Sequence, residues 1–379
     1  MFVRKKSKKP LAVVTALNPS NAGMYSVDLA AEQFLQSLGF DPILFRGQTR
    51  KGRRRERFGA QRFRAVPNEK ALLDAGGIVY WGDFTTSPLF ALQDYASREV
   101  ESGRCADVEA AFRVWSKKFL LADVKNRSAK VASIGQNFLG LETQISQMPA
   151  EDRKLLEICY RNNFDLVCPR DPLSTAEFKS VASGANSRVE LGMDAAFLLD
   201  HEALFPELSS VTPASSFGYL FGRSDLNERA FVERVEADTG LTPINLAQWL
   251  KLNRRKGHSQ YRRLLLSIAS SRFVITDLYH ASINSLALGV PVLGLGKISH
   301  AQIGTLSDLK KKILFCALGL DDFYLELTGP ELDSELVNEK FSHALANCLS
   351  GFEHHRETVM TKRADFRSRL SVVLSELML

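Results

Sequence analysis

The sequence lacks a long apolar run, and its few cysteines form no paired motif. No apolar stretch reaches the roughly 18 residues of a membrane-spanning helix, so we expect none. The cysteines are odd in number and widely spaced, without a CxxC pair: Cys105, Cys159, Cys168, Cys316 and Cys348. We therefore expect reduced thiols, no disulfide and a cytoplasmic protein. No group with the spacing of metal ligands is visible either, and we expect no metal.

Acidic residues are scarce in one part of the chain. The net charge is +6, yet residues 1–64 carry 14 Lys and Arg against four acids, so the remainder is net negative. A dense block runs from Arg46 to Arg64. Such a block is usually a solvated loop; alternatively it faces an anion such as a membrane surface, a lipid diphosphate or an acidic glycan. No recognition helix or aromatic-interleaved basic strand accompanies it, so we expect no nucleic-acid partner.

The N-terminal residues begin an α/β pattern. A basic stretch followed by the apolar residues 11–17 imitates a signal peptide, but the apolar part is short and Asn18-Pro19-Ser20 is a poor cleavage site. We interpret residues 11–17 as a first β-strand. A turn-rich loop over 18–23, a helical pattern over 26–38 and a strand over 41–45 follow. The loop could cradle a phosphate or a sugar hydroxyl, although it lacks a nucleotide-binding glycine motif.

Residues 272–297 give the clearest pattern in the chain. Residues 273–276 are apolar and β-branched, residues 281–288 have helical spacing, Gly289 and Pro291 end the helix, and 292–295 form a second apolar run. This order predicts two parallel strands joined by a right-handed crossover. Asp277, His280 and Lys297 then fall at the carboxyl ends of the strands, where ligands bind in such sheets. For His280 the alternative is a residue that merely caps the helix.

Other predicted strand ends also carry glycine or polar residues. Gly76 and Gly77 precede a strand that ends at Trp81; a strand over 130–135 leads to Gln136 and Asn137; and a strand over 164–168 leads to Arg170. Glycines at strand ends let a ligand approach the backbone. Arg170 can bind an anion or pair with Asp171, and the residues alone favour neither.

The second half of the chain repeats the α/β order. Residues 204–216 are rich in Pro, Ser and Thr and form the best linker candidate. A strand over 217–221, the loop with Arg223, a helix over 226–239 and a strand over 242–245 follow. A length of 379 residues also fits two domains at about 150 residues each. We therefore predict two Rossmann-like α/β lobes, residues 1–205 and 206–379, with a cleft between them and the last helix packed on one lobe.

In order and spacing, these segments resemble the polysaccharide pyruvyl transferase family. The family's loop after the first strand corresponds to Asn21-Ala22-Gly23-Met24, its glycine-rich strand end to Ala75-Gly76-Gly77, and its Gly-Gln-Gly segment to Gly135-Gln136-Asn137. Its Arg-Asp-x-x-Ser motif is intact from Arg170 to Ser174, and its Asp-x-Ala-Phe-Leu segment matches from Asp194. The strongest match runs from Val274 to His280 and on to Pro291. Met24 replaces a family Asp, and Leu278 a family Arg.

The resemblance implies a fold like that of GT-B glycosyltransferases, with an acceptor-side N-terminal lobe and a donor-side C-terminal lobe. It implies a transferase of exopolysaccharide biosynthesis. Phosphoenolpyruvate, the co-substrate, would give its enolpyruvyl carbon to two hydroxyls of one sugar on a polysaccharide or lipid-linked glycan. The products would be a pyruvate ketal and phosphate, and no cofactor would be needed.

The same resemblance suggests roles for particular residues. His280 would act as acid or base, because histidine titrates near neutral pH, and Asp277 would orient His280 or an acceptor hydroxyl. Cations would hold the donor, and polar or glycine residues of the first lobe would meet the acceptor. The donor-binding candidates are Arg170, Arg223 and Lys297; the acceptor-binding candidates are Asn21, Gly23, Gly76, Gly77, Gln136 and Asn137.

Two other functions fit the pattern. One is a nucleotide-sugar-dependent glycosyltransferase of the same fold, which would bind a nucleoside diphosphate in its second lobe. The other is a non-catalytic glycan-binding member that lost its chemistry with the Arg at position 278. We also expect peripheral contact with the inner face of a membrane through the block from Arg46 to Arg64. The residues do not indicate the acceptor sugar, the ketal linkage or the oligomeric state.

Overall fold

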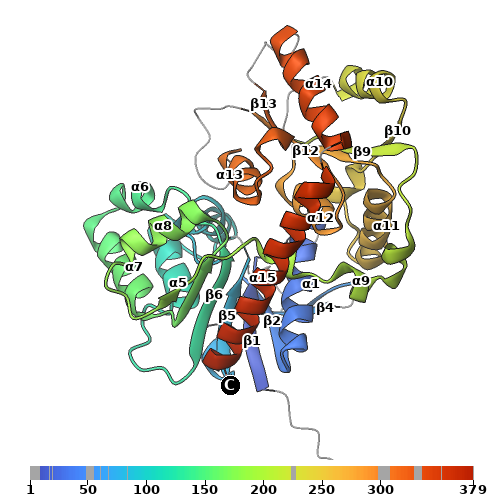
Figure 1. Cartoon of the computed structure of the whole chain (residues 1–379). Coiled ribbons are helices and arrows are strands. Elements are labelled where there is room, and N and C mark those ends of the chain that lie inside the picture. Colours follow the sequence, from blue (N-terminus) through green and yellow to red (C-terminus); the bar gives the residue numbers. More distant parts are fainter. Residues whose placement is uncertain are drawn as a thin grey trace, which may run out of the picture. The chain divides into compact units, whose positions relative to one another are not determined.

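The computed structural model describes residues 9–16, 18, 20–47, 55–59, 61–66, 68–82, 84–222, 228–297, 308–327, 335–350 and 352–378. The chain forms two compact units (Figure 1). Unit 1 consists of Met1–Leu17, Val27–Leu199 and Arg367–Leu379, and unit 2 of Asn18–Ser26 and Asp200–Phe366. The main division, between Leu199 and Asp200, lies close to the predicted boundary at 205, but Asn18–Ser26 groups with unit 2 and Arg367–Leu379 with unit 1. The cleft expected between the lobes stays a prediction.

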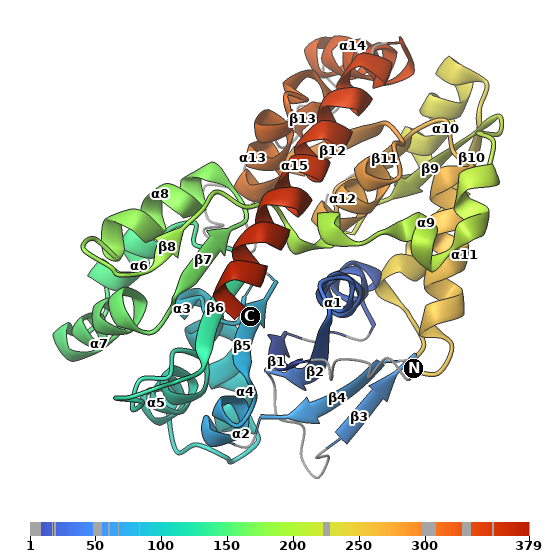
Figure 2. The same cartoon turned by 60° about the horizontal axis from the view of Figure 1, so that its bottom comes forward.

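Unit 1 is built on an open sheet of eight strands in the order β3-β4-β2-β1-β5-β6-β7-β8. All neighbours are parallel except β3 and β4, which form an antiparallel hairpin at one edge (Figure 2). The strands are β1 (Lys9–Thr15), β2 (Phe40–Arg46), β3 (Arg55–Phe58), β4 (Gln61–Ala65), β5 (Gly77–Trp81), β6 (Lys130–Gln136), β7 (Leu166–Pro169) and β8 (Arg188–Val189).

Alternate residues of the central strands face opposite layers of unit 1. On β5, Tyr80 points into a core with Trp115 and Phe119, whereas Trp81 packs near Phe34 on the other side. This period of two is what an extended strand covered on both faces produces. The helical segments are α1 (Ala22–Ser37), α2 (Lys70–Leu73), α3 (Pro88–Phe90), a π-helix (Ala91–Ala96), α4 (Ser97–Glu101), α5 (Val108–Phe119), α6 (Leu141–Ser146), α7 (Ala150–Asn162), α8 (Pro172–Val181) and a 3₁₀ turn (Ala195–Leu198).

Unit 2 contains a five-stranded parallel sheet in the order β10-β9-β11-β12-β13. Its strands are β9 (Ser216–Leu220), β10 (Thr242–Asn245), β11 (Val274–Thr276), β12 (Val292–Lys297) and β13 (Tyr324–Leu327). Its helical segments are α9 (His201–Leu204), 3₁₀ turns at Pro206–Ser210, Ala247–Leu250 and Asp321–Phe323, α10 (Glu228–Thr239), α11 (Gly257–Ala269), α12 (Tyr279–Ala287), α13 (Leu309–Leu318), α14 (Glu335–Ser350) and α15 (Phe352–Met378), whose end belongs to unit 1.

The prediction of two α/β lobes with open, mainly parallel sheets is confirmed, as is the unit β11-α12-β12. Gly289 has φ +72° directly after α12, which is the left-handed conformation expected there. The segment predicted as a linker is not structureless, because it contains the 3₁₀ turn Pro206–Ser210 and buries Phe205 and Leu208. Among the described residues, no helix is long and apolar enough to cross a membrane. The five cysteines are free thiols.

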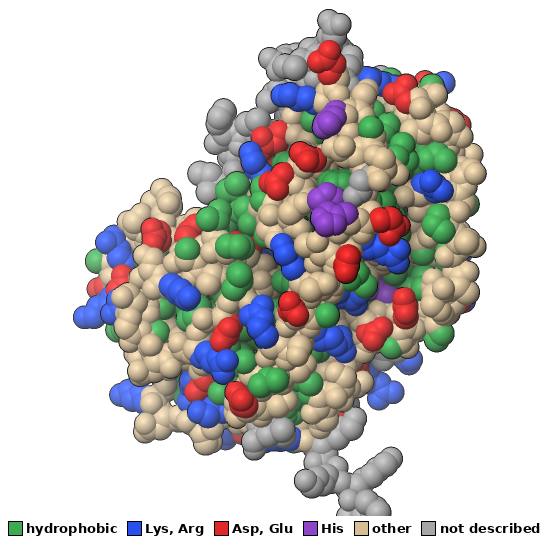
Figure 3. Space-filling view, in the orientation of Figure 1, with side chains coloured by type: hydrophobic (Ala, Val, Ile, Leu, Met, Phe, Trp, Pro, Cys, Tyr) green, Lys and Arg blue, Asp and Glu red, His purple; other side chains and the backbone are tan. Residues whose placement is uncertain are grey.

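The basic block is only partly the loop that the sequence suggested. Its described part contains β3 and β4, paired by antiparallel hydrogen bonds. Arg46, the first residue of the block, is buried and forms an ion pair with the buried Glu56. Elsewhere, on the face shown in Figure 3, Lys and Arg side chains are interspersed with Asp and Glu, the usual arrangement on a protein surface.

Candidate functional site

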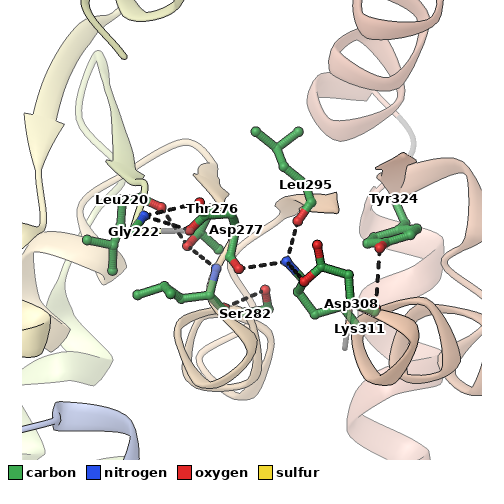
Figure 4. A network of polar contacts seen from close by, with 10 residues as sticks. Leu220, Gly222, Thr276, Asp277, Ser282, Leu295, Asp308, Lys311 and Tyr324 are labelled. Atoms are coloured by element: carbon green, nitrogen blue, oxygen red, sulfur yellow. Dashed lines mark hydrogen bonds and ion pairs between the residues drawn. The ribbon is translucent and has the colours of Figure 1, made fainter. Parts of the chain in front are cut away.

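The end of β11 and the residue that follows it are held by hydrogen bonds to the end of β9 and the loop after it (Figure 4). The hydroxyl of Thr276 donates to the carbonyl oxygen of Leu220 at 2.8 Å, and the backbone N–H of Gly222 lies 2.9 and 3.1 Å from the two carboxylate oxygens of Asp277. Asp277 therefore joins two neighbouring strand ends. It does not cap α12: the N-cap residue is Leu278, and no side chain caps the helix there.

His280 lies in the first turn of α12, where the backbone N–H groups have no partner within the helix. Its side chain is half-buried, with its ring in edge contact with the ring of Tyr279 at a centroid distance of 5.3 Å. The side chain of His280 also packs directly against Gly23 of α1, because a Cβ built on Gly23 would lie 2.3 Å from the Cβ of His280. The alternative of a capping histidine is wrong, since Leu278 holds that position.

Asn284, one turn after His280, is the centre of a buried polar network. Its side-chain nitrogen donates to the carbonyl oxygen of His280 at 2.8 Å and lies 3.0 Å from the hydroxyl oxygen of Ser26. Because a carbonyl can only accept, the amide oxygen must face the other way, where the hydroxyl of Tyr261 donates to it at 2.7 Å. The network therefore ties the first turn of α12 to α1 and α11.

His201 completes this network and is neutral. Its Nε2 lies 3.1 Å from the amide oxygen of Asn284, so Nε2 carries the proton. Burial lowers the pKa of His201 to about 4, because charging the ring would require desolvating a cation. Its Nδ1 is buried without a hydrogen-bond partner in the part of the chain that the structure describes. His201 acts here as a structural donor.

Lys311 of α13 is a buried cation behind the site (Figure 4). Its side chain is 1% exposed, and its ammonium donates to the carbonyl oxygens of Asp277 at 2.7 Å and Leu295 at 2.6 Å. A third contact, at 2.9 Å, reaches the carboxylate of Asp308. The three N–H donors of lysine are thereby matched. Lys311 joins the ends of β11 and β12 to α13.

Sequence reasoning missed Lys311 and its neighbour Lys310. The ammonium of Lys310 lies 5.1 Å from the ring centroid of Tyr279, a cation–π distance. The available signal was the spacing of Asp308 and Lys311, which are three apart at a helix start, where opposite charges meet on one face. Of the predicted donor-binding residues in unit 2, Lys297 ends β12 but its side chain lies outside the described part of the chain, as does all of Arg223.

In unit 1, the amides at the end of β6 are engaged inside the protein. Gln136 is fully buried; its side-chain oxygen accepts from the backbone N–H of Thr86 at 3.2 Å, and its nitrogen donates to the hydroxyl of Thr85 at 3.1 Å. Asn137 is also buried, and its oxygen accepts from the backbone N–H of Leu139. Their contact with an acceptor stays a prediction, and it would require these bonds to be shared.

Arg170 follows β7 and pairs with Asp171. Its Nε lies 3.4 Å from the carboxylate, and its side chain is fully buried. The same carboxylate caps α8, accepting from the backbone N–H of Ser174 at 2.7 Å and from its hydroxyl at 2.9 Å. Of the two alternatives left open for Arg170, the ion pair is present, and its role toward a donor anion stays a prediction.

The remaining acceptor candidates occupy structural positions. Gly76 and Gly77 lie at the amino end of β5, since Gly77 pairs with the first residue of β6, whereas Gln136 and Arg170 follow carboxyl ends. A Cβ on Gly77 would lie 2.7 Å from the sulfur of Met378, so this glycine makes room for α15. Asn21 accepts the backbone N–H of Gly23 at 2.9 Å at the start of α1. The predicted binding residues of unit 1 therefore lie at both ends of the strands: Gly76 and Gly77 at an amino end, and Gln136 and Arg170 at carboxyl ends.

Comparison with known proteins identifies one family. A family model described as polysaccharide pyruvyl transferase matches residues 29–297, more than half of the chain. The search of curated proteins found no match to this chain.

Solved structures with a similar fold include three that differ widely in sequence. A functionally uncharacterized protein from Klebsiella pneumoniae is 15% identical, with a TM-score of 0.44 over 85% of this chain and 94% of its own. A UDP-GlcNAc 2-epimerase from Methanocaldococcus jannaschii is 10% identical, with a TM-score of 0.48 over 90% and 93%. The wall teichoic acid polymerase TagF is 11% identical, with a TM-score of 0.46 over 98% and 88%. These values are too low to indicate a reaction.

Proposed function

The chain belongs to the polysaccharide pyruvyl transferase family, and we propose on this premise that it transfers a pyruvyl group from phosphoenolpyruvate to a polysaccharide or lipid-linked glycan. Two hydroxyls of one sugar add to the enol carbon, and the bond from that carbon to the phosphate oxygen breaks. One hydroxyl proton ends on the methylene carbon, which becomes a methyl group, and the other leaves with the phosphate. The product is a cyclic pyruvate ketal, and no cofactor takes part.

The observation that carries this proposal is the position of His280. It lies in the first turn of α12, directly after the carboxyl end of β11, and contacts with Gly23 and Asn284 hold it there. The reaction needs a group that moves protons between hydroxyl, carbon and phosphate, and an imidazole can both accept and donate one. In our proposal His280 is this group, and Asp277 keeps the strand end that precedes it in place.

Binding of the donor needs positive charge, since phosphoenolpyruvate carries a phosphate and a carboxylate. The N–H groups at the start of α12, which have no partner within the helix, favour an anion. Lys297 and Arg223 remain the donor-binding candidates of unit 2, and we add Lys310, whose ammonium faces the ring of Tyr279 next to His280. Lys311 is a poor candidate, because its three donors already meet protein oxygens.

The proposal includes a cytoplasmic location, with peripheral attachment at the inner face of a membrane. Phosphoenolpyruvate would be available in that compartment, and a lipid-linked acceptor would be presented at the membrane surface. The five free thiols are compatible with a reducing compartment.

The test is phosphate release from phosphoenolpyruvate in the presence of a panel of oligomeric and lipid-linked glycans. We expect release that depends on one glycan and a product heavier by one pyruvyl group. His280→Ala should release phosphate and form this product at least about 100-fold more slowly, while still melting cooperatively. Glycan binding without phosphate release would instead assign a binding protein. Release of a nucleoside diphosphate from a nucleotide sugar would assign a glycosyltransferase.

A further inference from the structure

One face of the β3–β4 hairpin is built from arginine. On β3, Arg55 and Arg57 alternate with Glu56 and Phe58; on β4, Arg62 and Arg64 alternate with Gln61 and Phe63. The four alternating partners are buried, and Arg57, Arg62 and Arg64 are exposed. Because side chains of a strand point alternately to its two faces, the strand positions of all four arginines share the outer face. Arg46 is not part of this face, since it is buried against Glu56.

The pairing register places like charges directly opposite each other. Arg57 pairs with Arg62, and Arg55 with Arg64. Side chains at such positions are about 5 Å apart, and like charges there destabilise the hairpin. Among the described residues no carboxylate lies within ion-pair distance of Arg62 or Arg64. Repulsion between these like charges therefore lowers the stability of the hairpin, and no described carboxylate offsets it at Arg62 or Arg64.

Protection of an edge strand does not explain this face. Charged residues on edge strands prevent pairing with other chains, and β3 is the edge strand. Arg62 and Arg64, however, lie on β4, which is paired on both sides, with β3 and with β2. An exposed face on which Arg62 and Arg64 have no described acid partner is instead suited to an anionic partner.

We propose that this outer face, through the exposed residues Arg57, Arg62 and Arg64, docks the protein on an anionic lipid surface. Both aromatic residues of the hairpin, Phe58 and Phe63, are buried on its other side, so the face offers no ring on which a nucleobase could stack. It presents charge alone, which is all that a layer of anionic headgroups requires. This docking rests on the peripheral attachment included in the proposed function but not on the transfer reaction, so its test needs neither phosphoenolpyruvate nor a glycan.

The experiment measures binding of the full-length protein to vesicles of equal parts phosphatidylglycerol and phosphatidylcholine, and to phosphatidylcholine alone. The test variant carries Arg57→Gln, Arg62→Gln and Arg64→Gln. The matched control carries Lys154→Gln, Arg161→Gln and Lys179→Gln, three exposed cations of unit 1 on or beside α7 and α8 that remove the same charge. We expect wild type to bind only the anionic vesicles and to weaken with salt. The test variant should lose affinity by roughly 100-fold, at about one factor of five per arginine, and the control should bind like wild type.

Removal of facing like charges should leave the melting temperature of the test variant equal to or above that of wild type, which separates docking from a structural role. Equal weakening of both variants would overturn the proposal, because net charge and not this face would then be responsible. So would binding that does not depend on anionic lipid, or a lowered melting temperature. Tighter binding of a single-stranded oligonucleotide than of anionic vesicles would assign the face to nucleic acid instead.

Discussion

Gly23 lies so close to His280 that no larger residue fits between the two backbones. A Cβ on Gly23 would lie 2.3 Å from the Cβ and 2.8 Å from the Cγ of His280. Both residues are at the start of a helix, Gly23 in α1 and His280 in α12. The glycine of the family's loop motif therefore has a physical explanation in this chain: it lets one helix start approach the other and sets the position of the imidazole.

Gly23→Ala should consequently lower turnover with little loss of stability. Alanine is the better helix former by up to about 1 kcal/mol, which offsets part of the overpacking. His280 must move to make room, and a displacement on the order of 1 Å can cost about 100-fold in rate. Steady-state kinetics and a melting curve of the same variant check this. Full activity of Gly23→Ala would mean that the position of His280 is not critical.

His280→Ala should reduce kcat by about 100- to 10,000-fold and change KM for phosphoenolpyruvate little, because a general acid–base contributes chiefly in the transition state. His280→Gln keeps a hydrogen-bonding group but cannot move a proton, so it should be nearly as slow. The measurement is kcat and KM from phosphate release. A Gln variant with most of the activity would show that His280 only positions the substrate.

Lys311→Met should destabilise unit 2 strongly, by about 3 to 5 kcal/mol, since it leaves the carboxylate of Asp308 and two carbonyl oxygens without their cation. Adding Asp308→Asn should recover part of this loss. The matched control is Lys312→Met: Lys312 pairs with Glu326 at 3.1 Å but is half-exposed, and such pairs contribute about 0 to 1 kcal/mol. Urea unfolding of the four proteins measures the difference. Equal effects of the two lysine substitutions would contradict a structural role for the buried ammonium.

Asp28→Asn should alter how stability depends on pH. Burial raises the pKa of Asp28 from 3.8 to about 8. Between these values the folded protein holds a proton that the unfolded chain releases, so stability falls as pH rises, by up to about 1.4 kcal/mol per pH unit. Asparagine has no proton to release, so the variant should gain stability relative to wild type from about pH 5 to about pH 8.

The control for this experiment is Asp41→Asn, at an exposed position of β2. It should follow the wild-type pH dependence. The free energy of unfolding in urea, measured at several pH values, distinguishes the two variants. Parallel curves for Asp28→Asn and wild type would mean that Asp28 is ionised in the folded protein.

The sequence by itself determined the elements of this protein and the order in which they follow one another. The apolar run before Asp277, the helical spacing after His280, and Gly289 with Pro291 were enough to predict β11, α12 and β12. These signals are local: strand and helix periodicity, and a glycine with φ +72° where a helix ends, depend on neighbours a few residues away. The position of His280 at a strand end followed from the same pattern.

Only the tertiary structure decided which residues surround His280 and which charges are buried. Asn18–Ser26 belongs to unit 2, so Gly23 and Ser26 reach α12 from more than 200 residues away in the chain. Lys311 and Arg46 look in the sequence like members of exposed basic runs, yet each is buried with a carboxylate, Asp308 or Glu56. A charge leaves water only when a partner meets it in three dimensions. The partner of Arg46 follows no spacing rule, and the spacing of Asp308 and Lys311 indicates an ion pair but not its burial, which is why composition and periodicity could not identify these residues as buried.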